Sequence, residues 1–250
     1  MGKPLAIDLF AGLGGWTEGL LAEGYEVTGY DIEAHEYGEH RYPAKLVIQD
    51  VLTLHGSQFK DAALIVASPP CQEYSYMAMP WKLAKAKAAA IRADTTGESL
   101  FKLNRLFNAC FRIQAEASLA AGRRIPMVVE NVRGAQPWVG RAQWNFGSFY
   151  LWGDVPALMP VPEQRRMKFP AHCGPRMWSE RECVTDGTPS AFHQEGRKQG
   201  GDWFAEARKG GEGGTSASFG SKSPARKMAS AMIAKIPLPL SQHIARTYRR

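Results

Sequence analysis

The sequence predicts an α/β fold of the Rossmann-like type, with a parallel sheet, on the strength of two observations. Short apolar runs alternate with helical patterns over residues 1–135, which is the arrangement of consecutive βαβ units. The first apolar run leads directly into a glycine-rich turn, Ala11–Gly15, which is followed by a helical pattern. In such folds ligands collect at the carboxyl ends of the strands, so we expect functional residues immediately after them.

Each expected strand is an apolar run that ends at a turn or a polar residue. In the first half of the chain these runs are 5–10, 25–30, 45–48, 62–67 and 125–129. The run at 62–67 is continuously apolar, which is typical of a strand buried on both faces. We also expect a strand at 148–152, which lies beyond the alternating region.

The expected helices follow from apolar spacing and from stop signals. One helix covers 16–23 and ends before Gly24, and a long amphipathic helix with Leu100, Phe107 and Ile113 on its apolar side ends at Gly122. Two more are expected at 226–235 and 240–248. The stretch 160–222 is rich in Gly, Pro, Ser and charge and has no regular pattern, so it is either a small irregular subdomain or a long insertion.

The composition is that of a globular protein with a basic excess. Of 250 residues 44% are hydrophobic, and 31 Lys+Arg against 24 Asp+Glu give a formal net charge of +7 and a pI of about 9.3. Wholesale disorder is excluded, and so is a transmembrane helix, because no run of about 18 apolar residues occurs. No secretory signal is visible and the four cysteines follow no disulfide pattern, so we expect a cytoplasmic protein. The basic excess is compatible with a nucleic-acid partner without requiring one.

The glycine-rich turn and two acidic residues have the chemistry of a nucleotide-type cofactor site. Glycines at a strand-to-helix turn let the backbone approach a cofactor, although the spacing differs from the dinucleotide pattern and the turn could serve chain geometry alone. Asp31, at the end of the second expected strand, can accept hydrogen bonds from both hydroxyls of a ribose. Asp50, after the third, can accept one from an adenine amino group.

A cysteine and a glutamate follow two other expected strands. Cys71 comes after Ser68-Pro69-Pro70 at the end of the fourth strand, where two prolines fix its direction and where an ionised thiol is a good nucleophile. Glu130 ends the fifth strand, and a carboxyl group there suits acid catalysis or hydrogen-bond donation better than packing. A lone cysteine is more often an inert core residue, which is the interpretation we give to Cys110.

Together and in this order, the three motifs resemble those of the DNA cytosine-5 methyltransferases. Asp8–Gly15 is similar to the S-adenosylmethionine motif of that family, Pro69-Pro70-Cys71-Gln72 to its nucleophile motif, and Glu130-Asn131-Val132 to its catalytic glutamate motif. The resemblance implies a Rossmann-like S-adenosylmethionine-dependent methyltransferase fold with a small target-recognition region. It implies duplex DNA as the partner and S-adenosyl-L-methionine as the cofactor. We further expect a monomer without a membrane partner, of a small phage or prokaryotic type, with restriction-modification as a role.

The resemblance also assigns roles to individual residues. The Cys71 thiolate would attack C6 of a flipped-out cytosine, and Glu130 would interact with N3, so that C5 can take the methyl group. The residues implied in cofactor binding are Phe10, Gly12, Gly14, Gly15, Asp31, Ile32, Asp50 and Pro70. Those implied in nucleic-acid binding are Gln72, Ser75, Arg133, Arg165 and Arg166. Residues 72–75 and the segment after them would form a mobile loop over the base.

The sequence departs from the family after the glutamate motif. The usual Gln-x-Arg-x-Arg motif is missing, and we expect Arg141 to replace it as a catalytic residue, with Arg165 or Arg166 as the alternatives. The expected division is a catalytic domain at 1–159, a target-recognition region at 160–222, and helices at 223–250 that pack back on the catalytic domain. His172, Cys173, Cys183 and His193 match no standard zinc spacing, so no metal is expected.

Two other functions remain open on the sequence alone. The same cysteine and glutamate motifs occur in relatives that act on tRNA, so an RNA cytosine-5 methyltransferase is one alternative. A non-catalytic DNA-binding relative is the other, although a binding protein would need neither Cys71 nor Glu130. The expected function is methyl transfer to C5 of cytosine in DNA.

Overall fold

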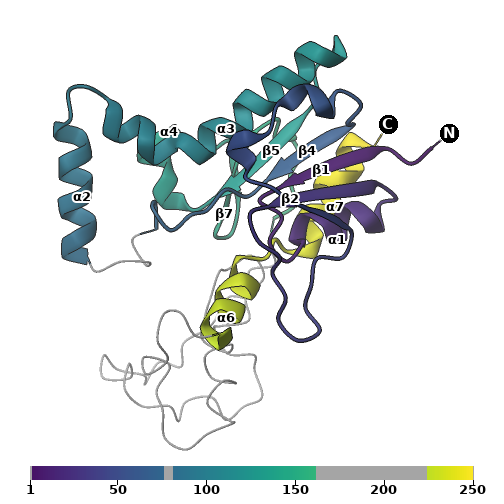
Figure 1. The fold of residues 1–250 in the computed structure, drawn as a ribbon, viewed down its shortest axis with the longest axis horizontal. Coiled ribbons are helices and arrows are strands. Elements are labelled where there is room, and N and C mark those ends of the chain that lie inside the picture. Colours follow the sequence, from purple (N-terminus) through teal and green to yellow (C-terminus); the bar gives the residue numbers. More distant parts are fainter. Residues whose placement is uncertain (1, 76–80, 162–223, 250) are drawn as a thin grey trace, which may run out of the picture.

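The computed structural model describes residues 2–75, 81–161 and 224–249. Within these ranges the chain forms a seven-stranded sheet in the order β3-β2-β1-β4-β5-β7-β6 (Figure 1). The strands are β1 (Leu5–Leu9), β2 (Glu26–Asp31), β3 (Lys45–Ile48), β4 (Leu64–Ala67), β5 (Met127–Asn131), β6 (Trp144–Phe146) and β7 (Phe149–Gly153). The α-helices are α1 (Gly15–Ala22), α2 (Trp81–Ala93), α3 (Glu98–Ala121), α4 (Gln136–Val139), α6 (Pro224–Ala234) and α7 (Leu238–Tyr248). Short 3₁₀ turns are η1 (Val51–Thr53), η2 (Gly56–Phe59) and η3 (Arg133–Ala135).

The sheet is parallel over the five strands of the alternating region and becomes mixed beyond it. Strands β1 to β5 pair in parallel, as predicted, but β7 runs antiparallel to both β5 and β6. A two-residue turn, Gly147-Ser148, joins β6 to β7, and such a short connection can only reverse the chain direction. Pairing with β7 also extends β5 through Asn131, so Glu130 and Asn131 lie inside the strand rather than after it.

The sheet is buried on both faces, as the continuous apolar run of β4 predicted. Leu64 and Val66 point to one face, where they pack with α1 and α7, while Ile65 and Ala67 point to the other, where they pack with α3. Figure 1 shows α1 and α7 on one side of the sheet and α3 on the other. The result is a three-layer α/β arrangement that leaves the carboxyl ends of the strands at one edge.

Four helices were predicted from the sequence, namely α1, α3, α6 and α7, and two were not. Helix α3 ends at Gly122, which adopts a left-handed conformation with φ 62°, as the stop signal predicted. Helix α2 was not predicted, because its alanines and lysines lack a strong apolar period; the high helix propensity of alanine favours it instead. Helix α4 and strand β6 were also not predicted. Helix α4 is a single turn of 4 residues and strand β6 has 3 residues, which is too short for a sequence pattern.

The C-terminal helix α7 packs tightly on α1. Leu240, Ile244 and Ala245 are buried in the same apolar cluster as Trp16 and Leu20 of α1. The Tyr25 hydroxyl donates a hydrogen bond to the backbone oxygen of Ala245 (3.0 Å). Lys235, just after α6, pairs with Glu18, and Arg246 pairs with Glu23 at 2.8 Å. The end of the chain thus braces the helix that follows the glycine-rich turn.

Candidate active site

The carboxyl ends of β1 to β5 bring most of the predicted site residues to one edge. Their order along the sheet is Asp50 after β3, Asp31 at the end of β2, Phe10 after β1, Cys71 after β4, and Glu130 near the end of β5. The strand order reverses between β1 and β4, and ligands of open α/β sheets bind at such a switch point. The glycine-rich turn lies on one side of this point and Cys71 on the other.

Asp31 is a buried, fixed carboxylate at this edge. It is only 8% exposed, and its two oxygens accept hydrogen bonds from the backbone N–H groups of Gly12 (2.8 Å) and Ile32 (2.7 Å). Burial raises the pKa of Asp31, but the side chain of His35 and the backbone N–H groups of Gly12 and Glu33 lower it by more, so the net pKa lies below the ordinary value. Asp31 therefore holds the turn after β1 as a charged group, with lone pairs left for other donors.

The predicted glycines serve two different purposes. A Cβ atom added to Gly12 would meet no other described atom within 4 Å, so the backbone there faces open space. A Cβ on Gly14 would lie 2.5 Å from Cδ of Pro43, and one on Gly15 would lie 2.3 Å from the backbone nitrogen of Ile236. Gly12 is thus the position suited to a bound molecule, whereas Gly14 and Gly15 are required by packing within the chain itself.

Other predicted cofactor residues follow β2 and β3 at the same edge of the sheet. Ile32 directly follows Asp31 and is 69% exposed, which is unusual for an isoleucine at the edge of a core. The Asp50 carboxylate accepts a hydrogen bond from Leu52 N (2.9 Å) and caps η1, so it is positioned by its own backbone. Ile48, which was not predicted as a site residue, is 55% exposed at the end of β3. A ligand that joins a flat ring to a sugar suits this arrangement. Its ring can pack on Ile32 and Ile48, and the hydroxyl groups of its sugar can donate hydrogen bonds to Asp31.

Three hydrogen bonds fix the segment that carries Cys71. Ser68 N donates to Leu9 O (3.2 Å), and Trp16 Nε1 donates to Ser68 Oγ (3.0 Å). The Asn131 side chain donates from Nδ2 to Pro69 O (2.9 Å). The half-buried Cys71 is therefore held on a rigid segment that continues β4.

Glu130 belongs to the strand next to this segment. In the β4–β5 register Ala67 pairs with Val129, so Glu130 lies beside Ser68 and Asn131 beside Pro69. Glu130 is 3% exposed, which shows that its carboxyl group points into the protein and not into bulk water. The sequence predicted that Cys71 and Glu130 would lie at one edge, and the structure brings them to neighbouring strands there.

Asn131 has a positioning role that the motif alone did not reveal. It is fully buried, and besides its bond to Pro69 its Oδ1 accepts a hydrogen bond from Val132 N (2.8 Å). Asn131→Ala would leave the Pro69 oxygen and the Val132 N–H without these partners. We expect it to lower the free energy of unfolding by about 1–3 kcal/mol, measured by urea denaturation. Asn145→Ala, which removes an exposed amide bonded to Gly147 O, is the control and should cost less than about 1 kcal/mol.

Equal losses in the two asparagine variants would contradict this positioning role. The comparison is direct because both side chains donate one hydrogen bond to a backbone oxygen and differ in burial. Trp16 is a second positioning residue that the sequence analysis missed, since its indole reaches Ser68 across 52 positions of the chain.

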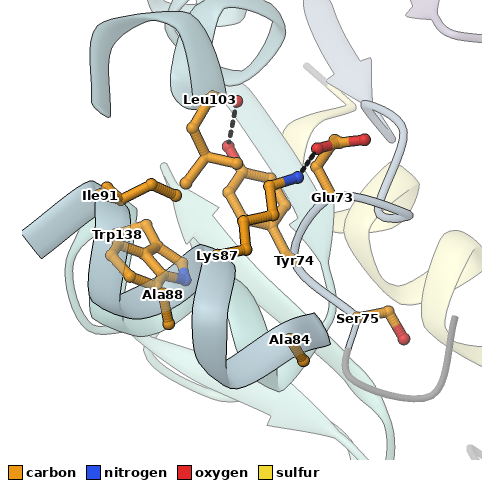
Figure 2. Close-up of a pocket in the computed structure, with 9 residues that line it drawn as sticks. All are labelled: Glu73, Tyr74, Ser75, Ala84, Lys87, Ala88, Ile91, Leu103 and Trp138. Carbon is orange, nitrogen blue, oxygen red and sulfur yellow. Dashed lines mark hydrogen bonds and ion pairs between the residues drawn. The ribbon is translucent and has the colours of Figure 1, made fainter. Parts of the chain in front are cut away.

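The residues after Cys71 are anchored to α2 and α3. The buried Tyr74 donates its hydroxyl hydrogen to Leu103 O (3.3 Å) or Asn104 Oδ1 (3.0 Å) of α3. Glu73 pairs with Lys87 of α2. Figure 2 shows Glu73, Tyr74 and Ser75 lining a pocket together with Lys87 and other side chains of α2, with Leu103, and with Trp138 of α4. Residues 72–75 were expected as a mobile loop, and in the structure they form a turn closed by hydrogen bonds from Tyr74 N and Ser75 N to Cys71 O.

The predicted nucleic-acid residues are only partly brought to this edge. Gln72 is exposed, Ser75 is half-buried in the pocket wall, and Arg133 is exposed at the start of η3, directly after β5. Arg165 and Arg166 lie outside the described residues.

Arg141 is exposed and lies three residues before β6. The first residue of β6, Trp144, pairs with Leu151, which in turn pairs with Glu130. The catalytic role of Arg141 stays a prediction. The β6–β7 turn at the carboxyl edge is Gly147-Ser148 and contains no arginine.

Neither a metal centre nor a membrane span is found in the described ranges. No three His, Cys, Asp or Glu side chains in residues 2–75, 81–161 and 224–249 gather in a way that could hold a metal ion. His172, Cys173, Cys183 and His193 lie outside these ranges. Among the helices that the structure describes, none has the length and apolar character needed to cross a bilayer.

The fold defines a Rossmann-like α/β protein. Five parallel strands in the order 3-2-1-4-5 and a glycine-rich turn after β1 are typical of that class, and the antiparallel β7 adds to the sheet beside β5. Residues 5–87 match the family model of the C-5 cytosine-specific DNA methylases, which confirms the predicted resemblance for that part of the chain. This match covers β1 to β4, Cys71 and the first half of α2.

Methyltransferases are among the solved structures that are similar to part of this chain. A DNA modification methyltransferase encoded within an E. coli prophage is 23% identical, with a TM-score of 0.35 over 53% of this chain and 33% of that one. The Dnmt2 methyltransferase of S. pombe is 16% identical, with a TM-score of 0.33 over 55% of this chain and 37% of that one. The matched part thus spans well under half the length of these proteins. A search of curated proteins gave no match.

Proposed function

We propose that this protein transfers a methyl group from S-adenosyl-L-methionine to C5 of cytosine in DNA. The observation that carries the proposal is the placement of Cys71 and Glu130 on neighbouring strands, across the switch point from an open glycine turn. The family match of residues 5–87 supports both the reaction and the DNA substrate.

The residues around the turn fit S-adenosyl-L-methionine. Gly12 leaves room for a ligand, the Asp31 carboxylate suits the two ribose hydroxyls, and Ile32 offers an apolar surface to the adenine. Asp50 is placed to accept a hydrogen bond from the adenine amino group, and Phe10 and Pro70 flank the site along the edge. The bound cofactor supplies an electrophilic methyl group. Gly14 and Gly15 contribute indirectly, by letting Pro43 and Ile236 pack against the turn.

Cys71 and Glu130 divide the chemistry between them. The Cys71 thiolate adds to C6 of cytosine and forms a covalent bond, while a proton held by Glu130 at N3 favours electron flow into the ring. C5 then becomes nucleophilic and takes the methyl group. Loss of the C5 proton and departure of the Cys71 sulfur restore the aromatic base. Burial of Glu130 suits this role because it excludes water from its carboxyl group.

The reaction requires the cytosine to leave the helix. A thiol at the edge of a sheet cannot reach C6 inside a duplex, so the target base is flipped out toward Cys71. Gln72, Ser75 and Arg133 are the described residues placed to contact the nucleic acid, and Arg165 and Arg166 are proposed to contribute from the target-recognition region at 160–222. Arg141, three residues before β6, is proposed as a further catalytic residue in place of the missing Gln-x-Arg-x-Arg motif.

Transfer of labelled methyl from S-adenosyl-L-methionine tests the function. Duplex DNA of varied sequence and tRNA are incubated in parallel with the full chain, and the products are digested to nucleosides. Label in 5-methylcytosine from DNA is the expected result. Label from tRNA alone would replace DNA by RNA as the substrate, and no label in either, with binding of the cofactor demonstrated, would refute an enzymatic function.

A further inference from the structure

Helix α2 is a basic element tied to the residues that follow Cys71. Its sequence, Trp81–Ala93, holds Lys82, Lys85, Lys87 and Arg92 and no acidic residue. Its inner side, with Ala84, Ala88 and Ile91, lines the pocket that Tyr74 and Ser75 also line (Figure 2). The ion pair between Lys87 and Glu73 links the middle of the helix to a residue two positions after the nucleophile.

The outer side of α2 carries charge on a flat surface of small side chains. Lys82, Lys85, Ala86, Ala89 and Arg92 are all exposed and are spaced i, i+3, i+4, i+7 and i+10, so they form one stripe along the helix. Ten residues of helix span about 15 Å. Alanines between the basic residues leave no large side chain to keep a partner at a distance. We call these five residues the basic stripe.

The stripe matches the chemistry of a phosphodiester backbone. Duplex DNA carries about one negative charge per 1.7 Å of its axis, so a 15 Å stripe faces several phosphates. Arg92 is additionally held in place, with its guanidinium carbon 5.2 Å from the centroid of the Trp138 ring. No acidic residue within α2 opposes this attraction.

We propose that the basic stripe of α2 binds the phosphate backbone of the DNA that delivers cytosine to Cys71. The inference rests on the proposed function and adds a surface that neither Cys71 nor Glu130 provides. Because α2 is joined to Glu73 and Tyr74, binding of phosphates on its outer side also positions the segment that covers the reacting base. The contact is independent of base sequence, since lysine and arginine meet only phosphates there.

The salt dependence of DNA binding tests the stripe. Binding of a fluorescent duplex by the full chain is measured by anisotropy at several KCl concentrations, for wild type and for the Lys82→Gln/Lys85→Gln variant. Log K falls as log[salt] rises, and each lost phosphate contact makes this slope less steep by about 0.9. The slope of the variant should therefore be less steep than that of wild type by about 2. The control is Lys45→Gln/Lys60→Gln, which removes the same charge from exposed positions before β3 and β4, at the opposite edge of the sheet.

The outcomes separate this inference from the proposed function. A less steep slope in the α2 variant, with an unchanged slope in the control variant, supports phosphate binding by the basic stripe. Equal slopes in all three proteins, or equal losses in both variants, overturn it even when wild type methylates DNA. Failure of wild type to bind DNA overturns both proposals. Circular dichroism of each variant verifies that the helix content is retained.

Discussion

Alanine in place of Cys71 is expected to reduce methyl transfer to DNA by about 10⁴-fold or more. Without the sulfur no bond forms at C6, and C5 of the intact aromatic ring is too weak a nucleophile to accept the methyl group. Cofactor binding should be unchanged, because the open space at Gly12 and the Asp31 carboxylate lie on the other side of the switch point. Steady-state kinetics and calorimetric titration of the cofactor measure the two quantities separately.

A matched control comes from the other cysteine that the structure describes. Cys110 is fully buried in α3, among the apolar residues that cover the sheet, and burial raises the pKa of its thiol above the ordinary value. Cys110→Ala should cost about 1 kcal/mol of stability through lost packing and leave the rate of methyl transfer unchanged. Comparable losses of activity in both variants would remove the argument for Cys71 as the nucleophile.

Covalent trapping distinguishes a nucleophile from a residue that only shapes the site. With 5-fluorocytosine in the DNA, C5 carries fluorine in place of the proton whose loss releases the enzyme. Wild type and Cys110→Ala should therefore form a complex with DNA that survives denaturing electrophoresis, and Cys71→Ala should form none. An adduct in Cys71→Ala would assign the covalent bond to another side chain.

The chemistry-bearing residues could be predicted because local patterns place them at strand ends. Cys71 follows a continuously apolar run and two prolines, and Glu130 interrupts another apolar run, so both are conspicuous in the sequence. A buried carboxyl group at such a position requires a specific reason. Because parallel strands end at the same edge of a sheet, the sequence also predicted that Cys71 and Glu130 lie at one edge. In the structure β4 and β5 are neighbouring parallel strands.

What the sequence did not reveal depends on contacts between distant residues. The backbone of Ile236 packs against Gly15 and leaves no room for a side chain there. No residue near Gly15 in the sequence indicates whether the glycine is required by this packing or by cofactor binding. The antiparallel β7 and the short β6 depend on a two-residue turn whose effect on the sheet is not local. Arg141 was chosen for its place ahead of the strand expected at 148–152, and the short β6 between the two was not expected.

A buried carboxylic acid beneath the cofactor turn makes stability depend on pH near neutrality. Asp8 in β1 is 1% exposed, and its Oδ2 accepts a hydrogen bond from the Thr17 hydroxyl (2.7 Å), which lies 2.5 Å from the Tyr42 hydroxyl. Its Oδ1 has no hydrogen-bond partner among the described residues. Burial raises the pKa of Asp8 from 3.8 to about 7, against the opposing effect of these hydroxyls.

The sign of the effect follows from the two pKa values. Between about pH 4 and pH 7 the folded protein keeps a proton on Asp8 that the unfolded chain has lost, so the free energy of unfolding falls as pH rises. The contribution is fully present below pH 3.8 and is lost as the pH passes through about 7. At 1.36 kcal/mol per pKa unit, the loss amounts to at most about 4 kcal/mol.

Asp8→Asn is expected to remove this dependence, because an amide has the shape of the acid and does not ionise. Relative to wild type, the variant should gain about 2.7 kcal/mol in free energy of unfolding between pH 5 and pH 8, because about two of the pKa units lie in this range at 1.36 kcal/mol each, and urea denaturation measures the gain. Asp94→Asn is the control. Hydrogen bonds from Thr96 and Ser99 hold the pKa of Asp94 below its ordinary value, so its contribution to stability is lost only as pH falls below about 4, and the difference of this variant from wild type should stay constant over pH 5–8. A constant difference for Asp8→Asn as well would show that Asp8 stays ionised throughout this range, and that the hydroxyls of Thr17 and Tyr42 compensate for its burial.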